Sequence, residues 1–294
     1  MVELQSGTFR MGSNRFYPEE APVRDVTVDG FWIDTHPVTV AAFRRFVKAT
    51  GHVTWAEQAP LATDYPGADP ELLVPGSLVF RKTDGPVDLR DYRNWWEWVP
   101  GADWRHPDGP ESNVGGRERH PVTHVSHSDA AAYAEWAGKS LATEAEWEYA
   151  ARGGLDQAIY TWGDKFAPEG RMMANTWQGN FPWQNLLLDR YEGTSPIESY
   201  PPNGYGLYDM AGNVWEWTDG WFGPEPQSAR QPCCAPQTPH ASGAEPFPRK
   251  VIKGGSHLCA PNYCLRYRPA ARQGEALDTS TGHIGFRCVI RQGA

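Results

Sequence analysis

The feature that most constrains the fold is the large number of glycine, proline and tryptophan residues. The chain of 294 residues contains 30 glycines, 26 prolines and 14 tryptophans. Glycine and proline interrupt helices and strands, so much of the backbone is expected to lie in loops and turns. Hydrophobic residues make up 40% of the chain, which supplies ample apolar area for a core. We therefore expect an irregular chain whose loops are held together by buried tryptophans.

A few segments carry the signals of regular structure. Three helices are expected, each bounded by capping residues and glycines: from Thr39 to about Gly51, from Ser126 or Ser128 to Gly138, and from the capping box Thr143-Glu-Ala-Glu146 to just before Gly153-Gly154. Short strands are expected between turn-rich loops, at Thr8–Met11, Arg24–Ile33, Val214–Thr218, Lys250–Lys253 and Ile284–Ile290.

The order of these elements predicts the fold class. Strands and helices do not alternate as they do in parallel sheets, so an α+β fold is favoured. The segment Ala59–Asp108 is rich in proline, glycine, aspartate and tryptophan. Its tryptophans make it too apolar for a free tether, so we interpret it as a long surface excursion. Nothing else resembles a linker, and residues 1–294 are predicted to form a single domain.

Charge and hydropathy exclude several classes of partner. The net charge is −9, from 36 acidic and 27 basic residues, which disfavours binding to nucleic acid or to an anionic membrane. It suits a peptide that carries arginine, and Glu57, Asp64 and Asp69 are candidates for such a groove. No run of 18 apolar residues is present, so no membrane span is expected. The N-terminal residues lack a signal-peptide pattern and the five cysteines are too few for a disulfide scaffold, so a cytoplasmic location is predicted.

The candidate chemistry lies in a cysteine pair near the C-terminus. Cys259 and Cys264 are five positions apart, and Ser256 precedes them. Pro261 and Asn262 favour a turn that would bring the two sulfurs together. A disulfide, two buried thiols, a soft-metal site and thiol chemistry all remain open. Structural zinc is disfavoured because no second pair of ligands has suitable spacing, whereas copper(I) suits two thiolates and leaves room for a third sulfur.

Neighbouring cations would affect these thiols. Arg266, Arg268 and Arg272 would favour thiolate over thiol if they face the sulfurs. The vicinal Cys233 and Cys234 lie in a proline-flanked segment, which we interpret as a variable loop rather than a redox site.

Histidines offer a weaker metal hypothesis. A strand is expected between His120 and Ser126, which would put His120 and His124 on one face and His127 on the other. A histidine metal site needs three converging ligands, so it is disfavoured.

The cysteine pair belongs to a longer pattern. The run Gly254-Gly-Ser256-x-x-Cys259-x-x-x-Tyr263-Cys264-x-Arg266-Tyr267-Arg268 resembles the catalytic core of formylglycine-generating enzymes. The likeness continues through Pro201-Pro-Asn-Gly-Tyr-Gly-Leu-Tyr-Asp209 and Gly212-Asn-Val-Trp215-Glu216-Trp217, and closes with Gly285-Phe286-Arg287-Cys288. It covers nearly the whole chain. The Gly-Asn-Val-Trp-Glu-Trp signature marks only the broader superfamily, whereas the cysteine pair is specific.

The resemblance implies a fold and an activity. The fold would be an elaborated C-type-lectin-like α+β fold with little regular structure. The activity would be a copper-dependent oxidase that uses O2 to convert the cysteine of a Cys-x-Pro-x-Arg motif, in unfolded sulfatase polypeptides, to Cα-formylglycine. Cys259 and Cys264 would hold copper(I), with the substrate cysteine as a third ligand. Ser256 would orient oxygen or a thiolate, and Trp215 would shape the pocket.

The same resemblance implies two structural calcium sites. Asn175 and Asp189 would give side-chain oxygens to the first site, and Thr176 and Tyr191 would give carbonyls. The second site would use Asp209, Gly212, Val214 and Glu216. Neither set has the spacing of an EF-hand loop, so the residues alone are equally consistent with turns and caps.

One departure and one alternative complete the expectations. His283 stands where some relatives carry asparagine near the oxygen pocket, and only histidine titrates near neutral pH. The alternative function is a non-catalytic lectin-like binding module, in which Cys259 and Cys264 are merely cross-linked. A monomer is predicted in either case.

Overall fold

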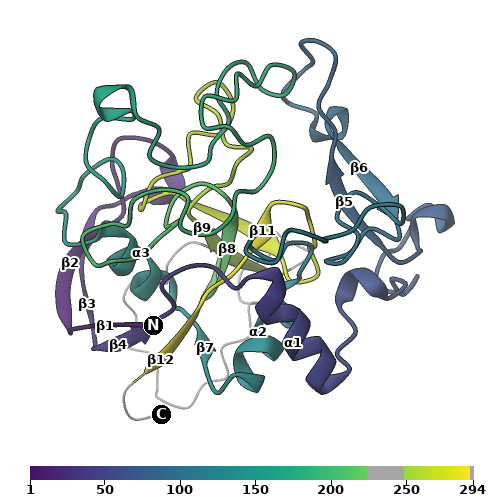
Figure 1. Ribbon diagram of the computed structural model, residues 1–294, viewed down its shortest axis with the longest axis horizontal. Helices are drawn as coiled ribbons and strands as arrows, with labels where there is room; N and C mark the ends of the chain where they lie inside the picture. Colours follow the sequence, from purple (N-terminus) through teal and green to yellow (C-terminus); the bar gives the residue numbers. More distant parts are fainter. Residues whose placement is uncertain (224–247, 292–294) are drawn as a thin grey trace.

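The computed structural model describes residues 1–223 and 248–291. Its regular structure consists of short helices and strands joined by long loops (Figure 1). The three α-helices are α1 (Val40–Thr50), α2 (His127–Trp136) and α3 (Glu144–Arg152). Single-turn 3-10 helices interrupt the loops at η1 (Pro18–Glu20), η2 (Trp55–Glu57), η3 (Pro70–Leu72), η4 (Tyr92–Asn94) and η5 (Pro168–Gly170). Both the α+β class and the low content of regular structure agree with the sequence analysis.

The helix boundaries follow their capping residues. The Thr39 side chain accepts a hydrogen bond from Ala42 N at 3.2 Å, and Gly51 ends α1 in the left-handed conformation at φ 71°. Ser126 caps α2 and Thr143 caps α3, each through a capping box. All three predicted helices are therefore confirmed, because side-chain caps satisfy backbone N–H groups that a helix end leaves free.

Two four-stranded sheets organise the rest of the described chain. The first has the order β10-β9-β8-β11 and lies at the centre of Figure 1. Its strands are β8 (Trp215–Trp221), β9 (Arg249–Lys253), β10 (Arg272–Ala276) and β11 (Ile284–Gly285). The second has the order β1-β4-β12-β7, and its strands are β1 (Val2–Leu4), β4 (Phe31–Ile33), β7 (Ser140–Leu141) and β12 (Cys288–Arg291). Two antiparallel pairs complete the strands, β2 (Gly7–Met11) with β3 (Arg24–Val28) and β5 (Gly76–Phe80) with β6 (Trp96–Pro100).

Two predicted strands were wrong in their extent. Arg24–Ile33 divides into β3 and β4, which belong to different sheets. Ile284–Ile290 likewise divides into β11, which pairs in parallel with β8, and β12, which pairs antiparallel with β4. Each run is apolar enough for a continuous strand, but the chain leaves one sheet and enters another within it. Such a transfer leaves little trace in a pattern of alternating side chains.

The segment Ala59–Asp108 contains the β5–β6 hairpin, which the sequence analysis did not predict. The hairpin lies to one side of the central sheet in Figure 1. It is attached to the rest of the chain, because Ser77 Oγ donates to Ser280 O at 2.7 Å and Leu78 forms a bridge with Thr281. The description of this segment as a surface excursion rather than a tether therefore holds.

Buried tryptophans hold the loops together, as the composition predicts. The fully buried tryptophans are Trp95, Trp147, Trp177, Trp215 and Trp217. Trp217 Nε1 donates to Val125 O at 3.0 Å, so one side chain both fills the core and fixes a distant loop. No helix among the described residues is long and apolar enough to cross a membrane.

Candidate active site

The two cysteines lie at the ends of a tight turn that follows strand β9. Cys259 N donates to Ser256 O at 3.0 Å, and Cys264 N donates to Ala260 O at 2.8 Å. Gly255 begins this turn at φ 67°, and a Cβ there would lie 2.7 Å from Tyr267 N, so only glycine allows the approach. The turn brings the two thiols together.

The sulfur atoms form a reduced, closely spaced pair. Cys259 Sγ and Cys264 Sγ are 3.0 Å apart, and both cysteines are free. A disulfide requires a separation of about 2.05 Å. The side chains are 2% and 7% exposed, so Cys264 is the more accessible of the two. The merely cross-linked pair considered above is therefore not the state seen here.

Ser256 lies beside the two thiols, and Trp215 lies in the same part of the core. The backbone N–H of Ser256 donates to Cys259 Sγ at 3.4 Å, and its hydroxyl accepts from Leu258 N at 3.2 Å. Ser256 is fully buried, so its hydroxyl is shielded from bulk water. Trp215 belongs to the large buried cluster that also contains the two cysteines. The chemical roles of these four residues remain predictions.

Only one of the three candidate arginines faces the thiols. Arg266 lies close enough to Cys264 for its charge to lower the pKa of that thiol, and it donates to Glu19 Oε1 at 2.7 Å. Arg268 instead pairs with buried Glu20, and Arg272 pairs with Glu144. The expectation for Arg268 and Arg272 was wrong, because a carboxylate holds each guanidinium away from the sulfurs.

The surroundings distinguish the two thiols. The pKa of Cys264 is lowered by the hydrogen bond from Cys259 and by the nearby charge of Arg266. Burial raises the pKa of Cys259, and the adjacent Cys264 raises it further. The arrangement therefore favours a thiolate at Cys264 that accepts a hydrogen bond from the Cys259 thiol.

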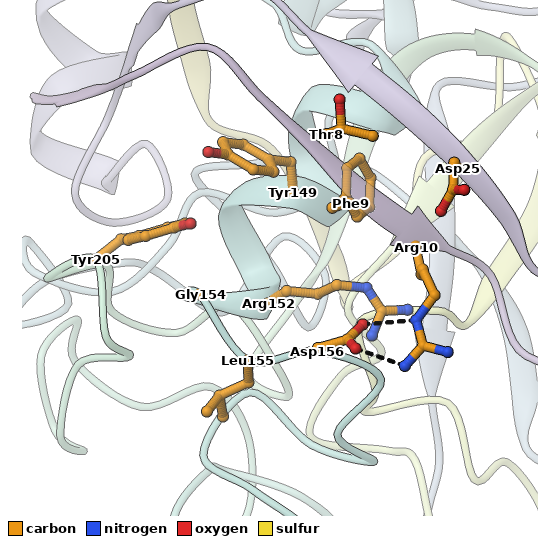
Figure 2. A pocket seen from close by; sticks show the side chains of 10 residues that line it. All are labelled: Thr8, Phe9, Arg10, Asp25, Tyr149, Arg152, Gly154, Leu155, Asp156 and Tyr205. Atoms are coloured by element: carbon orange, nitrogen blue, oxygen red, sulfur yellow. Dashed lines mark hydrogen bonds and ion pairs between the residues drawn. The ribbon is translucent and has the colours of Figure 1, made fainter.

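Two cavities formed by the described residues have linings that can be compared with the position of the thiols. One of about 670 Å³ is bordered by Arg266, which reaches Cys264, and by Glu19 and Glu275. Another of about 400 Å³ lies between β2 and α3 (Figure 2), and neither cysteine lines it. There Arg10 and Asp156 form a two-point ion pair, with Nε to Oδ1 at 2.8 Å. Neither cysteine lines the first cavity either, so Arg266 is the residue that it shares with the surroundings of the thiols.

With this geometry in view, comparison with known proteins decides the family. A model of the sulfatase-modifying factor enzyme 1-like domain matches residues 1–292. The chain belongs to this family. A formylglycine-generating enzyme of Mycobacterium tuberculosis is 57% identical over 98% of this chain and 97% of its own length. A mouse protein named inactive Cα-formylglycine-generating enzyme 2 is 37% identical over 100% of this chain and 86% of its own.

Among solved structures, the chain is similar to PvdO from Pseudomonas aeruginosa. The TM-score is 0.63 at 26% identity, covering 99% of this chain and 93% of that one. This similarity and the family match together confirm the fold that the sequence resemblance implied.

Residues far away in sequence support the cysteine turn of this family member. Tyr17 OH accepts from Leu265 N at 3.0 Å, and its ring lies 3.9 Å from the Arg266 guanidinium. The Asn262 side-chain amide accepts from Phe181 N at 3.3 Å and donates to Phe181 O at 3.4 Å. Tyr263 stacks on the Phe181 ring at 4.5 Å. Sequence reasoning missed Tyr17, Glu19 and Phe181, because no local pattern marks a contact across such separations.

The histidine expectation needs correction. The segment from His120 to Ser126 is not a strand, and His124 has φ 58°. Without a strand, His120 and His124 do not share a strand face as expected. His120 Nδ1 instead lies 2.9 Å from Thr194 Oγ1, while His124 Nδ1 lies 2.7 Å from Ser77 Oγ.

His283 is a half-buried, neutral residue. Its Nδ1 lies 2.6 Å from Thr281 Oγ1, and its ring packs against Trp96 at 4.8 Å. Burial, together with nearby His257 and His124, lowers the pKa of His283 to about 3. His283 is therefore uncharged at neutral pH, and its backbone carbonyl accepts from Trp215 N at 2.9 Å.

The residues of the first expected calcium site suit a hard cation. Asn175 Oδ1 is buried without a hydrogen-bond partner among the described residues, although the same amide donates to Gly193 O at 2.9 Å. Buried Asp189 accepts from Thr176 N and Tyr191 N, both at 3.1 Å. Burial raises the pKa of Asp189. A buried amide oxygen without a hydrogen-bond partner and a buried carboxylate are the kinds of donor that calcium binds. Gln178, which sequence reasoning missed, donates to Asp189 at 2.6 Å.

The second expected site suits calcium less well. Burial raises the pKa of Asp209 to about 6, and Asp209 Oδ2 accepts from Glu198 N at 3.0 Å. Glu216 already accepts from Trp147 Nε1 at 2.7 Å and from two nitrogens of Arg287 at 2.7 and 2.8 Å. Gly212 lies in the turn at φ 72°, close to Asn175 O. Glu216 is thus held in a structural ion pair, which competes with its use as a metal ligand.

The other candidates are surface groups or lie elsewhere. Glu57 belongs to the capping box of η2 and pairs with Arg105, while Asp69 caps η3. Asp64 accepts from Thr63 Oγ1 at 3.3 Å. These contacts account for the carboxylates without a substrate. Cys233 and Cys234 lie outside the described residues.

Proposed function

We propose that the chain is a formylglycine-generating enzyme that oxidises a cysteine of sulfatase polypeptides. The observation that carries the proposal is the reduced thiol pair, with sulfurs 3.0 Å apart, next to the buried Ser256. The similarity to a named enzyme of this kind at 57% identity supports it. A module that only binds has no need of two converging free thiols and a neighbouring hydroxyl.

The proposed cofactor is copper(I), held by Cys259 and Cys264. Two thiolates form a soft donor set that suits this ion. No group of three or more His, Cys, Asp or Glu side chains within residues 1–223 and 248–291 is arranged to hold a metal. A copper(I) ion held only by Cys259 and Cys264 would therefore keep a coordination position free for the substrate thiol. When bound, copper(I) would supply the electron transfer that activates O2, the proposed co-substrate.

The protein's own residues would prepare this site for the substrate. Arg266 and the Cys259 thiol stabilise negative charge on Cys264, the more exposed sulfur. The N–H of Ser256 holds Cys259 in the turn, and Trp215 contributes to the apolar cluster that keeps water from the pair. The substrate loses two electrons and two protons from its Cβ–Sγ unit, and hydrolysis then releases sulfide. Full reduction of one O2 to water consumes two further electrons from an external thiol.

The substrate motif and the structural ions extend the same proposal. The motif Cys-x-Pro-x-Arg carries a cation, and Glu19 and Glu275 border the cavity next to Arg266. Calcium at Asn175, Thr176, Asp189 and Tyr191 is supported by the unpartnered Asn175 Oδ1. Calcium at Asp209, Gly212, Val214 and Glu216 has weaker support because of the Arg287 pair. A cytoplasmic monomer remains our prediction.

The test is conversion of a synthetic Cys-x-Pro-x-Arg peptide. We expect the copper-loaded, reduced protein to convert CH2SH to CHO only when oxygen and a thiol reductant are present, as measured by mass spectrometry. The variants C259S and C264S should be inactive, whereas C288S is a matched control, because Cys288 is also a free, buried thiol but lies in β12. An unchanged peptide under these conditions would reject the enzyme and favour the binding module, which is the alternative function.

A further inference from the structure

Three consecutive leucines are exposed on the loop that supports the cysteine turn. Leu186, Leu187 and Leu188 are 54%, 41% and 63% exposed, and we call them the leucine patch. Single exposed leucines are ordinary, but a contiguous apolar surface typically marks an interaction site. The leucine patch is therefore a candidate interaction surface.

The loop holds these side chains in a defined position. Leu186 N donates to Gln178 O at 2.6 Å, and Leu187 N donates to Asn185 Oδ1 at 3.2 Å. Leu187 has φ 51°, a left-handed conformation that is unfavourable for a residue with a large side chain. These hydrogen bonds fix the loop backbone in a form that leaves the three leucine side chains exposed.

The same loop is continuous with the proposed active site. Trp177 N donates to Cys259 O at 3.1 Å, and Phe181 is held by Asn262 and stacked on Tyr263. From Phe181 to Leu186 the chain spans at most about 18 Å, even if fully extended. Tyr263, which precedes Cys264, stacks on Phe181, so the patch begins within about 18 Å of a residue in contact with the cysteine turn.

A second copy of the chain and an extended polypeptide segment differ in size and chemistry as occupants of the leucine patch. At their exposed fractions the three side chains offer roughly a few hundred Å². A stable dimer interface requires about 800 Å² from each partner, so a second copy of the chain fits poorly. An extended segment of three or four residues, at about 3.4 Å per residue, matches three adjacent leucines. Unfolded polypeptides expose apolar side chains that folded proteins bury, which is the chemistry that the patch would recognise.

We propose that the leucine patch binds an apolar segment of the unfolded sulfatase polypeptide, outside the motif that carries the reacting cysteine. This inference rests on the proposed function and extends it from a short motif to the flanking chain. The patch selects unfolded substrates, because only an unfolded chain presents the motif and an apolar segment together. Leu186, Leu187 and Leu188 act in specificity and do not touch the reacting atoms.

The test compares two substrates in the variant L186S/L187S/L188S. One is a short peptide limited to the motif, and the other is an unfolded sulfatase-derived polypeptide with apolar residues after the motif. We expect KM for the long substrate to rise about tenfold or more, because apolar contacts are lost, while kcat/KM for the short peptide stays unchanged. L155S is the control, since Leu155 is an exposed leucine at the cavity of Figure 2.

A binding measurement separates this inference from the proposed function. The long polypeptide with its cysteine replaced by serine cannot react, and fluorescence anisotropy then reports affinity alone. Weaker binding to the triple variant than to wild type and L155S supports the patch. Equal binding overturns the proposal, and so does an equal loss with both substrates, which would mean that the variant disturbs the cysteine turn. A shift in molar mass by light scattering with unchanged substrate binding would also overturn it by assigning the patch to a second copy. If wild type binds the long polypeptide at the patch but converts neither substrate, the proposed function fails while the interaction surface remains.

Discussion

The buried ion pair between Glu20 and Arg268 should be a main determinant of stability. Arg268 Nη1 donates to Glu20 Oε2 at 2.9 Å, and a second nitrogen contacts Oε1. The Glu20 side chain is 0% exposed and the Arg268 side chain is 1% exposed. The pair joins η1, near the N-terminus, to the segment that follows Cys264. We expect the substitution Glu20→Ala to leave the arginine charge buried without its partner.

The size of the effect follows from this burial. Removing one member of a buried pair costs about 3–5 kcal/mol, because the remaining charge is neither solvated nor compensated. Because the entropy of unfolding grows with chain length, that loss lowers Tm by roughly 5–8 °C for a chain of this size. The substitution Asp156→Ala is the control, because Asp156 and Arg10 are 66% and 51% exposed. That surface pair should contribute little to stability, because solvent screens the two charges.

Urea unfolding and calorimetry measure both variants. The double substitution E20L/R268M distinguishes the buried charge from lost packing, since it removes both ions while keeping apolar volume. It should be closer to wild type in stability than E20A. The reasoning is refuted if E20A loses no more stability than D156A, or if E20L/R268M is less stable than E20A.

Three further predictions address the histidines, Ser256 and Asn175. Burial lowers the pKa of His124 to about 4. The neutral side chain therefore contributes fully to the free energy of unfolding above pH 6.5, and this contribution declines as the pH falls towards 4. At pH 5 the free energy of unfolding is reduced by about 2 kcal/mol. Urea unfolding at pH 7 and pH 5 should therefore show a smaller pH-dependent loss in H124Q than in wild type, and equal losses would contradict this. Ser256→Ala removes the hydroxyl that accepts from Leu258 N; we expect peptide conversion to fall about 10- to 100-fold with copper binding retained, and full activity would exclude a role for the hydroxyl. Calcium at 100 times its Kd should stabilise wild type by about 2.7 kcal/mol. Thermal scans with and without chelator should show that N175A loses this stabilisation. The same stabilisation in N175A as in wild type would argue against the first calcium site.

Local signals in the sequence were sufficient for the helices and the cysteine turn. Thr39, Ser126 and Thr143 each cap a helix where the capping pattern predicts it, because a cap depends on residues within one turn. The Pro261-Asn262 turn likewise brings Cys259 and Cys264 together through short-range hydrogen bonds. These features depend on neighbours in sequence, so the sequence alone predicts them.

Contacts between distant segments were not predictable in this way. Arg266 and Arg268 lie two positions apart and look equivalent, yet Arg266 reaches Cys264 while Arg268 pairs with Glu20. The difference arises because η1 packs against the segment after Cys264, and no periodicity in the sequence encodes that contact. The β5–β6 hairpin was missed for a related reason. Its stability depends on Ser280 and Thr281 about 200 residues later, as the Ser77–Ser280 hydrogen bond shows.

The most direct test of the central claim is a copper(I) titration of the reduced protein against a competing chelator of known affinity. We predict one tightly held ion per chain, lost in either C259S or C264S and retained in C288S. Retention of the ion by both single variants of the pair, or its loss only in C288S, would contradict the assignment of Cys259 and Cys264 as the copper ligands.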